Sequence, residues 1–403
     1  MSKDKAGSGY RWIILLAIVP IIVSTEIMWL SLAPISSMAE SFYGVSSMSI
    51  SLFSMSYMIM YIIFSLPASW VVDRYGYRHS LIIGSLITAI FGLVRAIFAE
   101  DYLIVMLAQF IIAIGQPFLL NISTKVPANW FPASERSTAA GILTMAQYLG
   151  FAVPMVLAPM ISESSGIPKT FMDFAFIAII SAFIAIVFTR EKPPVPPPGP
   201  VAPKEDLSLT SIRKLFSKRT FLLPLIICFI SMGIFNAFLT LIEGILLPRG
   251  ITSAQAGVVG AVFVVAGIVG AVVLPIISDK LRVRTPFFVA VIALLIFLYL
   301  GLTFVENFTL LVIIAGITGF SIMGVAPILF QYGTEAAYPI QEGTSLGVIL
   351  LMGQISGVLF IYLFELLQNK TGTIVWPMLL FVVLTAIELP MTLKMKETDV
   401  SAG

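Results

Sequence analysis

The sequence is poor in cysteine, histidine and charged residues. Cys228 and His79 are each the only residue of their kind, and Asp, Glu, Lys and Arg make up 11% of 403 residues. A single cysteine excludes an intrachain disulfide, and this residue set cannot supply a metal centre or a Ser/His/Asp triad. Soluble proteins carry about 25% charged residues. The composition therefore excludes a soluble enzyme, a nucleic-acid-binding protein and a disordered chain, and we expect no enzyme activity, no cofactor and no metal.

Long apolar segments take up most of the chain, which is 59% hydrophobic. A helix needs about 20 mostly apolar residues to cross a bilayer. Twelve segments meet this requirement: 12–36, 47–72, 80–99, 102–125, 137–161, 169–189, 221–246, 253–278, 285–304, 307–331, 343–367 and 372–393. We therefore expect an all-α membrane protein with twelve transmembrane helices.

The distribution of Lys and Arg predicts the orientation, because cytoplasmic loops carry an excess of both. With the N-terminus in the cytoplasm, nineteen of these residues lie on the cytoplasmic side and three, Lys169, Arg249 and Lys370, lie outside. Both termini are thus predicted to be cytoplasmic. The remaining cation, Arg95, lies inside the third span, where we expect it to snorkel or to pair with an acid. Short loops fit a plasma membrane or a prokaryotic inner membrane.

One long polar segment, 190–220, separates the first six predicted spans from the last six. It begins with a proline-rich run that predicts extended polyproline structure, and 207–218 then predicts a short amphipathic helix on the cytoplasmic face. The expected domains are therefore an N-terminal six-helix bundle, 1–189, this linker, and a C-terminal six-helix bundle, 221–403.

The two halves resemble each other at a nearly constant spacing of 206 or 207 positions. Matched pairs include Asp73 and Asp279, Arg74 and Lys280, Arg78 and Arg284, and Gln147 and Gln354. A duplicated six-helix unit, with a site near the bilayer midplane between the copies, is the design of the major facilitator transporters.

The loop at 73–78 reads DRYGYR and resembles the major facilitator pattern G-x-x-x-D-R-x-G-R-R. Ser69 stands in place of the first glycine, and Tyr77 in place of the first basic residue of the closing pair. An acid at a helix end with nearby cations can hold helices together in one state of a transport cycle. The alternative is a cluster of positive charge that only sets the topology. We favour a conformational latch, because the second half repeats the pattern. Its residues are Asp73, Arg74, Arg78, Asp279 and Lys280.

Span one carries Glu26 and Trp29, which share a helix face at i and i+3. A carboxylate beside an indole suits an organic cation through charge pairing and cation–π attraction. The alternatives are a protonated Glu26 packed between helices and a Trp29 that only fills the core. We favour function for Glu26, because intramembrane acids mark transport pathways, and leave both readings of Trp29 open.

Four amides lie at a similar depth: Gln116, Gln147, Asn236 and Gln354. An amide can hydrogen-bond a substrate hydroxyl or carboxyl, or can join two helices. We expect Gln116 and Gln354 to contact the ligand, and leave both roles open for Gln147 and Asn236. Three further acids nearer the span ends are interpreted as structural: Glu243, Glu365 and Glu388.

Several strings go beyond the superfamily. They include FYGVS at 42–46, QPF at 116–118, WF at 130–131 and EAAYP at 335–339. Their order and spacing resemble the feline leukemia virus subgroup C receptor-related family of major facilitator transporters. That resemblance implies transport of choline and ethanolamine, with a debated role in haem export.

The resemblance also implies which residues bind choline. Trp29, Gln116 and Gln354 match three positions of the family's site, whereas Asn236 stands where the family has a tyrosine. Glu26 is a second departure, since the family has no acid there. A carboxylate can replace an aromatic partner of a cation or can carry a coupling proton, so the substrate need not be choline.

We interpret the chain as a secondary transporter that moves a small organic solute, an amine or a quaternary ammonium compound such as choline, by alternating access. The alternative is a proton-coupled carrier of another solute with Glu26 as the proton site. A receptor or sensor on a transporter scaffold is the alternative from another class, and the short loops argue against it. The expected partners are the solute, the lipid bilayer and protons or another coupling ion, without nucleic acid, and we expect a monomer.

Overall fold

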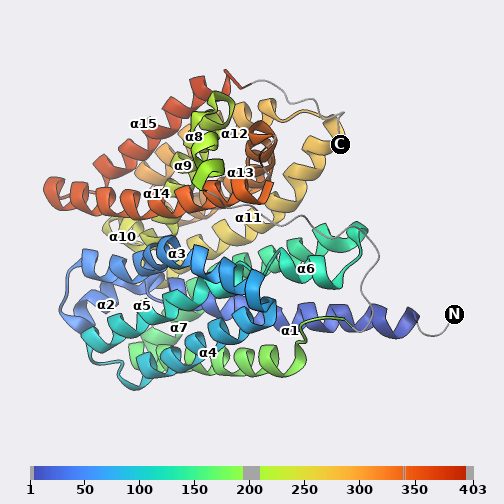
Figure 1. Cartoon of the computed structure of the whole chain (residues 1–403). Coiled ribbons are helices and arrows are strands. Elements are labelled where there is room, and N and C mark those ends of the chain that lie inside the picture. The colour runs from blue at the N-terminus through green and yellow to red at the C-terminus, as the bar shows by residue number, and fades with distance from the viewer. Residues whose placement is uncertain (1–3, 194–208, 339, 341, 396–403) are drawn as a thin grey trace. The chain divides into compact units, whose positions relative to one another are not determined.

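The computed structural model describes residues 4–193, 209–338, 340 and 342–395. Every regular element in these ranges is a helix (Figure 1), which confirms the all-α prediction. Eleven of the described helices are long and apolar enough to cross a membrane. Their outer faces carry large apolar side chains, such as Leu103, Phe183 and Phe297, which are 64–71% exposed. Such faces suit contact with lipid.

The chain divides into two compact units, Met1–Pro203 and Lys204–Gly403. The division falls within the expected linker, and most of its proline-rich run lies outside the described residues. The helix expected at 207–218 is present as α8 (Leu209–Ser217), which packs against α9 and α14 of the second unit.

The N-terminal unit places α1 along α7 and α4 against both α5 and α7. Small residues let these helices approach closely. A Cβ on Gly84 of α4 would lie 2.9 Å from the carbonyl oxygen of Gly115 on α5. The elements are α1 (Asp4–Leu30), η1 (Ala33–Ile35), α2 (Ser36–Tyr43), α3 (Ser47–Tyr75), α4 (Tyr77–Ile97), α5 (Tyr102–Leu120), α6 (Lys125–Trp130) and α7 (Ala133–Phe188).

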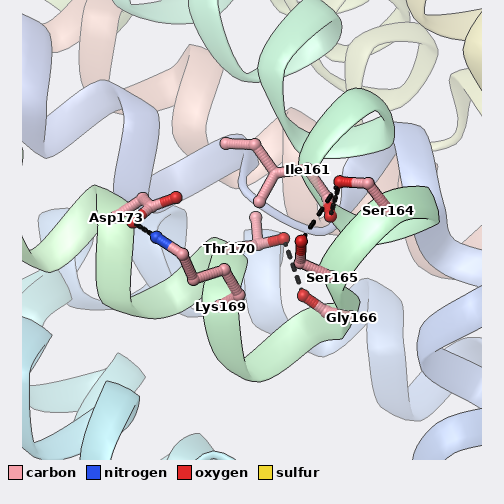
Figure 2. Close-up of polar contacts among 7 residues, drawn as sticks. All are labelled: Ile161, Ser164, Ser165, Gly166, Lys169, Thr170 and Asp173. Carbon is pink, nitrogen blue, oxygen red and sulfur yellow. Dashed lines mark hydrogen bonds and ion pairs between the residues drawn. The ribbon is translucent and has the colours of Figure 1, made fainter.

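Helix α7 contains the fifth and sixth predicted spans. Its 56 residues would extend for about 84 Å at the rise of an α-helix, far beyond the hydrocarbon thickness of about 30 Å. Gly166, with φ of 81°, breaks the helix between the two spans. Figure 2 shows this corner, where the hydroxyl of Thr170 donates to the carbonyl oxygen of Gly166 at 3.1 Å and Lys169 pairs with Asp173. The eleven long helices therefore contain all twelve predicted crossings.

The C-terminal unit packs α11 against α13, α9 against α14 and α12 against α15. The first contact is again made by glycine, because a Cβ on Gly319 would overlap the carbonyl oxygen of Phe263. The elements after α8 are α9 (Arg219–Thr240), α10 (Ile242–Leu246), η2 (Leu247–Arg249), α11 (Ser253–Leu281), α12 (Thr285–Phe304), α13 (Phe308–Ala337), α14 (Glu342–Thr371) and α15 (Val375–Thr392).

Candidate functional site

Glu26 on α1 meets Gln116 on α5 inside the N-terminal unit. The side-chain nitrogen of Gln116 lies 3.0 and 3.2 Å from the two carboxylate oxygens of Glu26. Both side chains are buried, at 1% and 6% exposure. Gly150 lets α7 approach beside them, because a Cβ at this position would lie 2.5 Å from the Cβ of Glu26. Three helices thus enclose the acid, and one of them supplies a neutral hydrogen-bond donor.

Two aromatic rings contact Trp29, which follows Glu26 by one helical turn. Its indole nitrogen donates to the carbonyl oxygen of Ser54 on α3 at 2.9 Å, which fixes the ring orientation. The ring stacks with Tyr57 at a centroid distance of 6.4 Å and meets Phe151 edge-on at 5.2 Å. An aromatic cluster of this kind can attract a cation through its ring faces.

Glu26 has no cationic partner in the part of the chain that the structure describes. The ion pairs found there are Arg11–Glu135, Lys125–Asp73, Lys169–Asp173 and Arg284–Glu335. An ionised carboxylate enclosed by apolar helices gains most when a cation joins it, because attraction is stronger at low dielectric constant than in water.

Arg95 holds the end of α1 that carries this site. Its guanidinium donates to the carbonyl oxygen of Met28 at 3.3 Å and to the side-chain oxygen of Gln109 at 2.5 Å. Gln109 in turn donates to the same Met28 carbonyl at 3.2 Å. The last carbonyl groups of a helix have no partner within it and form the negative end of its dipole. Arg95 and Gln109 thus fix the backbone next to Trp29.

The two expectations for Arg95 are wrong. The side chain is fully buried, so it does not snorkel, and among the described residues it pairs with no acid. Its guanidinium instead lies 4.3 Å from the ring centroid of Phe171 on α7. The end of a helix and an aromatic face together replace the expected carboxylate.

The other predicted amides belong to both units. Gln147 on α7 is partly buried in the N-terminal unit. In the C-terminal unit, Asn236 on α9 is buried and its amide donates to the carbonyl oxygen of Gly353 on α14 at 3.3 Å. Gln354 is the next residue and is partly buried. Asn236 therefore joins two helices beside Gln354, and a ligand contact by any of these three residues stays a prediction.

Comparison with known protein families identifies the architecture. The family model of the Major Facilitator Superfamily matches residues 8–361, which is most of the chain. The chain belongs to the Major Facilitator Superfamily.

Individual relatives within the superfamily confirm the closer resemblance. The choline/ethanolamine transporter FLVCR1 of Mus musculus is 30% identical over 91% of this chain and 71% of its own length. Solute carrier family 49 member A3 of Xenopus tropicalis is 28% identical over 90% of this chain and 79% of its own length. The choline/ethanolamine transporter FLVCR2 of Homo sapiens is 28% identical over 88% and 71%. Within the superfamily, the chain is thus a member of the feline leukemia virus subgroup C receptor-related family.

A solved structure agrees on the fold. A bacterial homologue of the human lysosomal transporter Spinster, in an inward-facing and unoccupied conformation, has a TM-score of 0.74 at 17% identity and covers 95% of this chain and 96% of its own. The chain is therefore a multi-pass membrane transporter of the superfamily, and the expectation that it is not an enzyme is confirmed by these relatives.

The superfamily loop at 73–78 is tied to the end of α7. Gly76 has φ of 95°, a conformation that favours glycine. The backbone N–H of Arg78 donates to the carboxylate of Glu191 at 2.8 Å, and the hydroxyl of Tyr77 donates to the carbonyl oxygen of Arg190. Glu191 thus places a negative charge at the N-terminus of α4, where the helix dipole stabilises it.

Four charged residues of the predicted latch lie at the surface, whereas Arg78 is partly buried. Asp73 pairs with Lys125 at 3.0 Å with both side chains well exposed, and Arg74 is exposed. Asp279 and Lys280 are also exposed and form no ion pair within the described residues. The repeated loop instead uses Arg284, which pairs with Glu335 at 2.7 Å. A latch between helices during transport stays a prediction.

Sequence reasoning missed four residues around Glu26 and Trp29 and one residue at the loop 73–78. Gln109 was available from the pattern, because it lies seven residues before Gln116 on the same helix and is polar within an apolar span. The others carry no local signal, since their importance comes from neighbours on other helices. They are Tyr57, Phe151, Gly150 and Glu191.

Proposed function

We propose that this transporter moves a small amine or quaternary ammonium compound, with choline as the reference solute, by alternating access. The observation that supports this most is the buried carboxylate of Glu26, which has an amide donor but no cationic partner in the described ranges of the chain. A substrate ammonium group supplies the missing charge. An anionic solute would be repelled at the same position.

The residues next to Glu26 suit the rest of such a molecule. The rings of Trp29, Tyr57 and Phe151 offer apolar surface and π faces to methylated nitrogen. Gln116 uses its NH₂ group on Glu26, so its oxygen is the atom that can accept a hydrogen bond from a substrate hydroxyl or N–H group. The named substrates of the relatives, choline and ethanolamine, combine these features.

Asn236 and Gln354 are proposed as the contacts contributed by the C-terminal unit, and Gln147 as a further one from α7. Asn236 provides an amide where the family has an aromatic ring. This exchange favours a solute with a hydrogen-bonding group over one with three methyl groups, so ethanolamine-like amines belong to the proposed class beside choline.

A thermal-shift screen of the purified transporter tests the solute class, because a ligand that binds only the folded state raises the melting temperature. Choline is compared with its uncharged carbon analogue, in which a tert-butyl group replaces the trimethylammonium group. We expect stabilisation by choline and ethanolamine and little by the analogue or by carboxylates. Equal stabilisation by choline and its analogue would contradict a role for the carboxylate.

A second candidate is a proton-coupled carrier of another solute in which Glu26 itself carries the proton. It is favoured by the neutral amide partner, since a hydrogen bond from Gln116 also suits a protonated carboxyl group. In that case Glu26→Gln binds solute normally and loses only uphill accumulation. Under the proposed function the same variant loses affinity.

We also propose that both termini are cytoplasmic, in a plasma or inner membrane, and that the transporter acts as a monomer. Lys169 is exposed at the corner between the fifth and sixth spans. A cysteine at this position is expected to react with an impermeant maleimide from outside intact cells. Natural Cys228 is buried and adds little background. Labelling only after the cells are opened would place this corner in the cytoplasm and contradict the proposed topology.

A further inference from the structure

A second buried acid lies in the C-terminal unit. Glu388 on α15 is 1% exposed, and its carboxylate accepts a hydrogen bond from the hydroxyl of Ser231 on α9 at 2.8 Å. None of the ion pairs among the described residues includes it. Glu388 is therefore enclosed within the unit, although it lies nearer the end of its span.

Among the residues that the structure describes, the groups that face Glu388 supply no positive charge. The titratable groups that interact with it electrostatically are Cys228 on α9 and Tyr299 on α12, and both are buried. Helix α14 also packs against α15, through the rings of Phe360 and Phe364 on Phe381. An uncompensated charge is costly in such surroundings. The neutral, protonated carboxyl group is thus the form that fits this packed arrangement.

The internal repeat shows that the contact itself does not need an acid. Ser231 and Glu388 lie 207 positions after Ser24 and Ser181. In the N-terminal unit, the hydroxyl of Ser24 on α1 donates to the hydroxyl of Ser181 on α7 at 2.9 Å. The same two positions of the repeat are thus joined by a hydrogen bond in both units. Two hydroxyls are sufficient to join the helices, so the carboxyl group of Glu388 adds a capacity that packing does not require.

We propose that Glu388 is the site that binds and releases a coupling proton. In the packed arrangement the carboxyl group holds the proton and accepts a hydrogen bond from Ser231. When α15 and α9 separate enough to admit water, the proton passes to a water molecule, which leaves as hydronium, and the remaining carboxylate is hydrated. Return of a proton restores the neutral group and the helix contact.

Helix α9 connects this proton site to the proposed solute site. Ser231 faces α15, and Asn236, five residues later, bonds to α14. Five residues correspond to about 140° around a helix, so the two side chains lie on different faces of one rigid element. A shift of α9 that follows loss of the proton also moves Asn236. This inference rests on the proposed transport function, in which Glu26 serves the solute and Glu388 the proton.

The test uses the full chain in proteoliposomes, with Glu388→Gln and Glu388→Ser. Gln keeps the hydrogen bond to Ser231 but cannot release a proton in this range of pH. Ser recreates the pair that joins Ser24 and Ser181. Labelled choline is the probe, and two rates are measured: exchange at equal pH and accumulation driven by a pH gradient. A melting curve of each variant confirms folding.

We expect the wild type to accumulate choline when a pH gradient is imposed. Both variants should retain exchange within about two-fold, because the helix contact survives, and should lose accumulation. If Glu388 were only structural, Glu388→Gln would accumulate choline like the wild type, and the proposal would be overturned. Exchange without pH-driven accumulation in the wild type would overturn it as well.

A measurement without solute separates this inference from the proposed function. Infrared difference spectra between acidic and alkaline buffer report the C=O band of a carboxyl group that gains and loses a proton. We expect such a band in the wild type and in Glu26→Gln, and its loss in Glu388→Gln. A band unchanged by Glu388→Gln would refute the proton site, independently of the results for choline binding and exchange. Failure of choline to bind or exchange, with a band that depends on Glu388, would refute the proposed solute alone.

Discussion

The amide of Gln116 bonds to both carboxylate oxygens of Glu26, at 3.0 and 3.2 Å, across the contact of α5 with α1. One neutral donor thus orients an acid that has no cationic partner among the described residues. The arrangement fixes the direction of the carboxyl group but supplies no counter-charge, so a cation can join it. The position of the Glu26 carboxyl group therefore depends on how the surrounding helices pack against α1.

Gly150 is predicted to be required for the approach of α7 to α1. In Gly150→Ala the new Cβ meets the Cβ of Glu26 at 2.5 Å and the carbonyl oxygen of Val23 at 2.8 Å. Overpacking of this kind costs about 1–3 kcal/mol, so the melting temperature and choline affinity should both fall. Gly141→Ala on the same helix is the matched control, because nothing lies within 4 Å of its Cβ. Equal effects of the two changes would show that the contact at Gly150 is not tight.

Arg95 is predicted to position the solute site through the end of α1. Arg95→Met removes the donor to the Met28 carbonyl, and a lost hydrogen bond from a charged group costs about 1.5–3 kcal/mol. We expect choline affinity to fall by about ten-fold, as the backbone beside Trp29 loosens.

The control for Arg95 is Arg249→Met in the C-terminal unit. Arg249 also donates to backbone carbonyl oxygens, those of Val305 and Ile245, at 2.9 and 3.1 Å. It lies outside the spans, and burial lowers the pKa of its guanidinium. We expect a loss of stability with little change in choline affinity. Unchanged affinity in Arg95→Met would leave Arg95 as a stabilising residue only.

Asp73 is predicted to act in the transport cycle and not in folding. Its pair with Lys125 is exposed, and such pairs contribute about 0.2–1 kcal/mol. Asp73→Asn should therefore melt near the wild-type temperature and bind choline normally, yet exchange choline several-fold more slowly. Lys125→Gln removes the same ion pair and serves as the control. A wild-type exchange rate in Asp73→Asn would reduce Asp73 to a charge that sets topology.

The fold was predictable from sequence because each span is a local property. Twenty apolar residues predict a crossing wherever they occur, and the repeat of 73–78 at 279–284 indicates the duplication. Helix α7 agrees as well, because Gly166 marks the corner between two predicted spans.

The side-chain partners were not predictable in the same way. Lipid is as apolar as the interior of a helical bundle, so the sequence of a span does not show which face is buried. The positions of Tyr57 and Phe151 around Trp29 depend on how α3 and α7 are rotated. The partners of Arg95 depend on where α1 ends, and no acid in the sequence marks that place. The lack of a cation beside a buried acid is therefore visible only in the structure.

The most direct measurement is the affinity of purified Glu26→Gln for choline and for its uncharged tert-butyl analogue, by isothermal titration calorimetry beside the wild type and Trp29→Ala. Gln keeps the size of the side chain and its hydrogen-bonding capacity but carries no charge. We predict that Glu26→Gln weakens choline binding by about ten-fold or more and leaves the analogue unaffected. Trp29→Ala should weaken choline by about 0.5–2 kcal/mol, with partial rescue by Trp29→Phe. Wild-type affinity for choline in both Glu26→Gln and Trp29→Ala would contradict a cation site at Glu26.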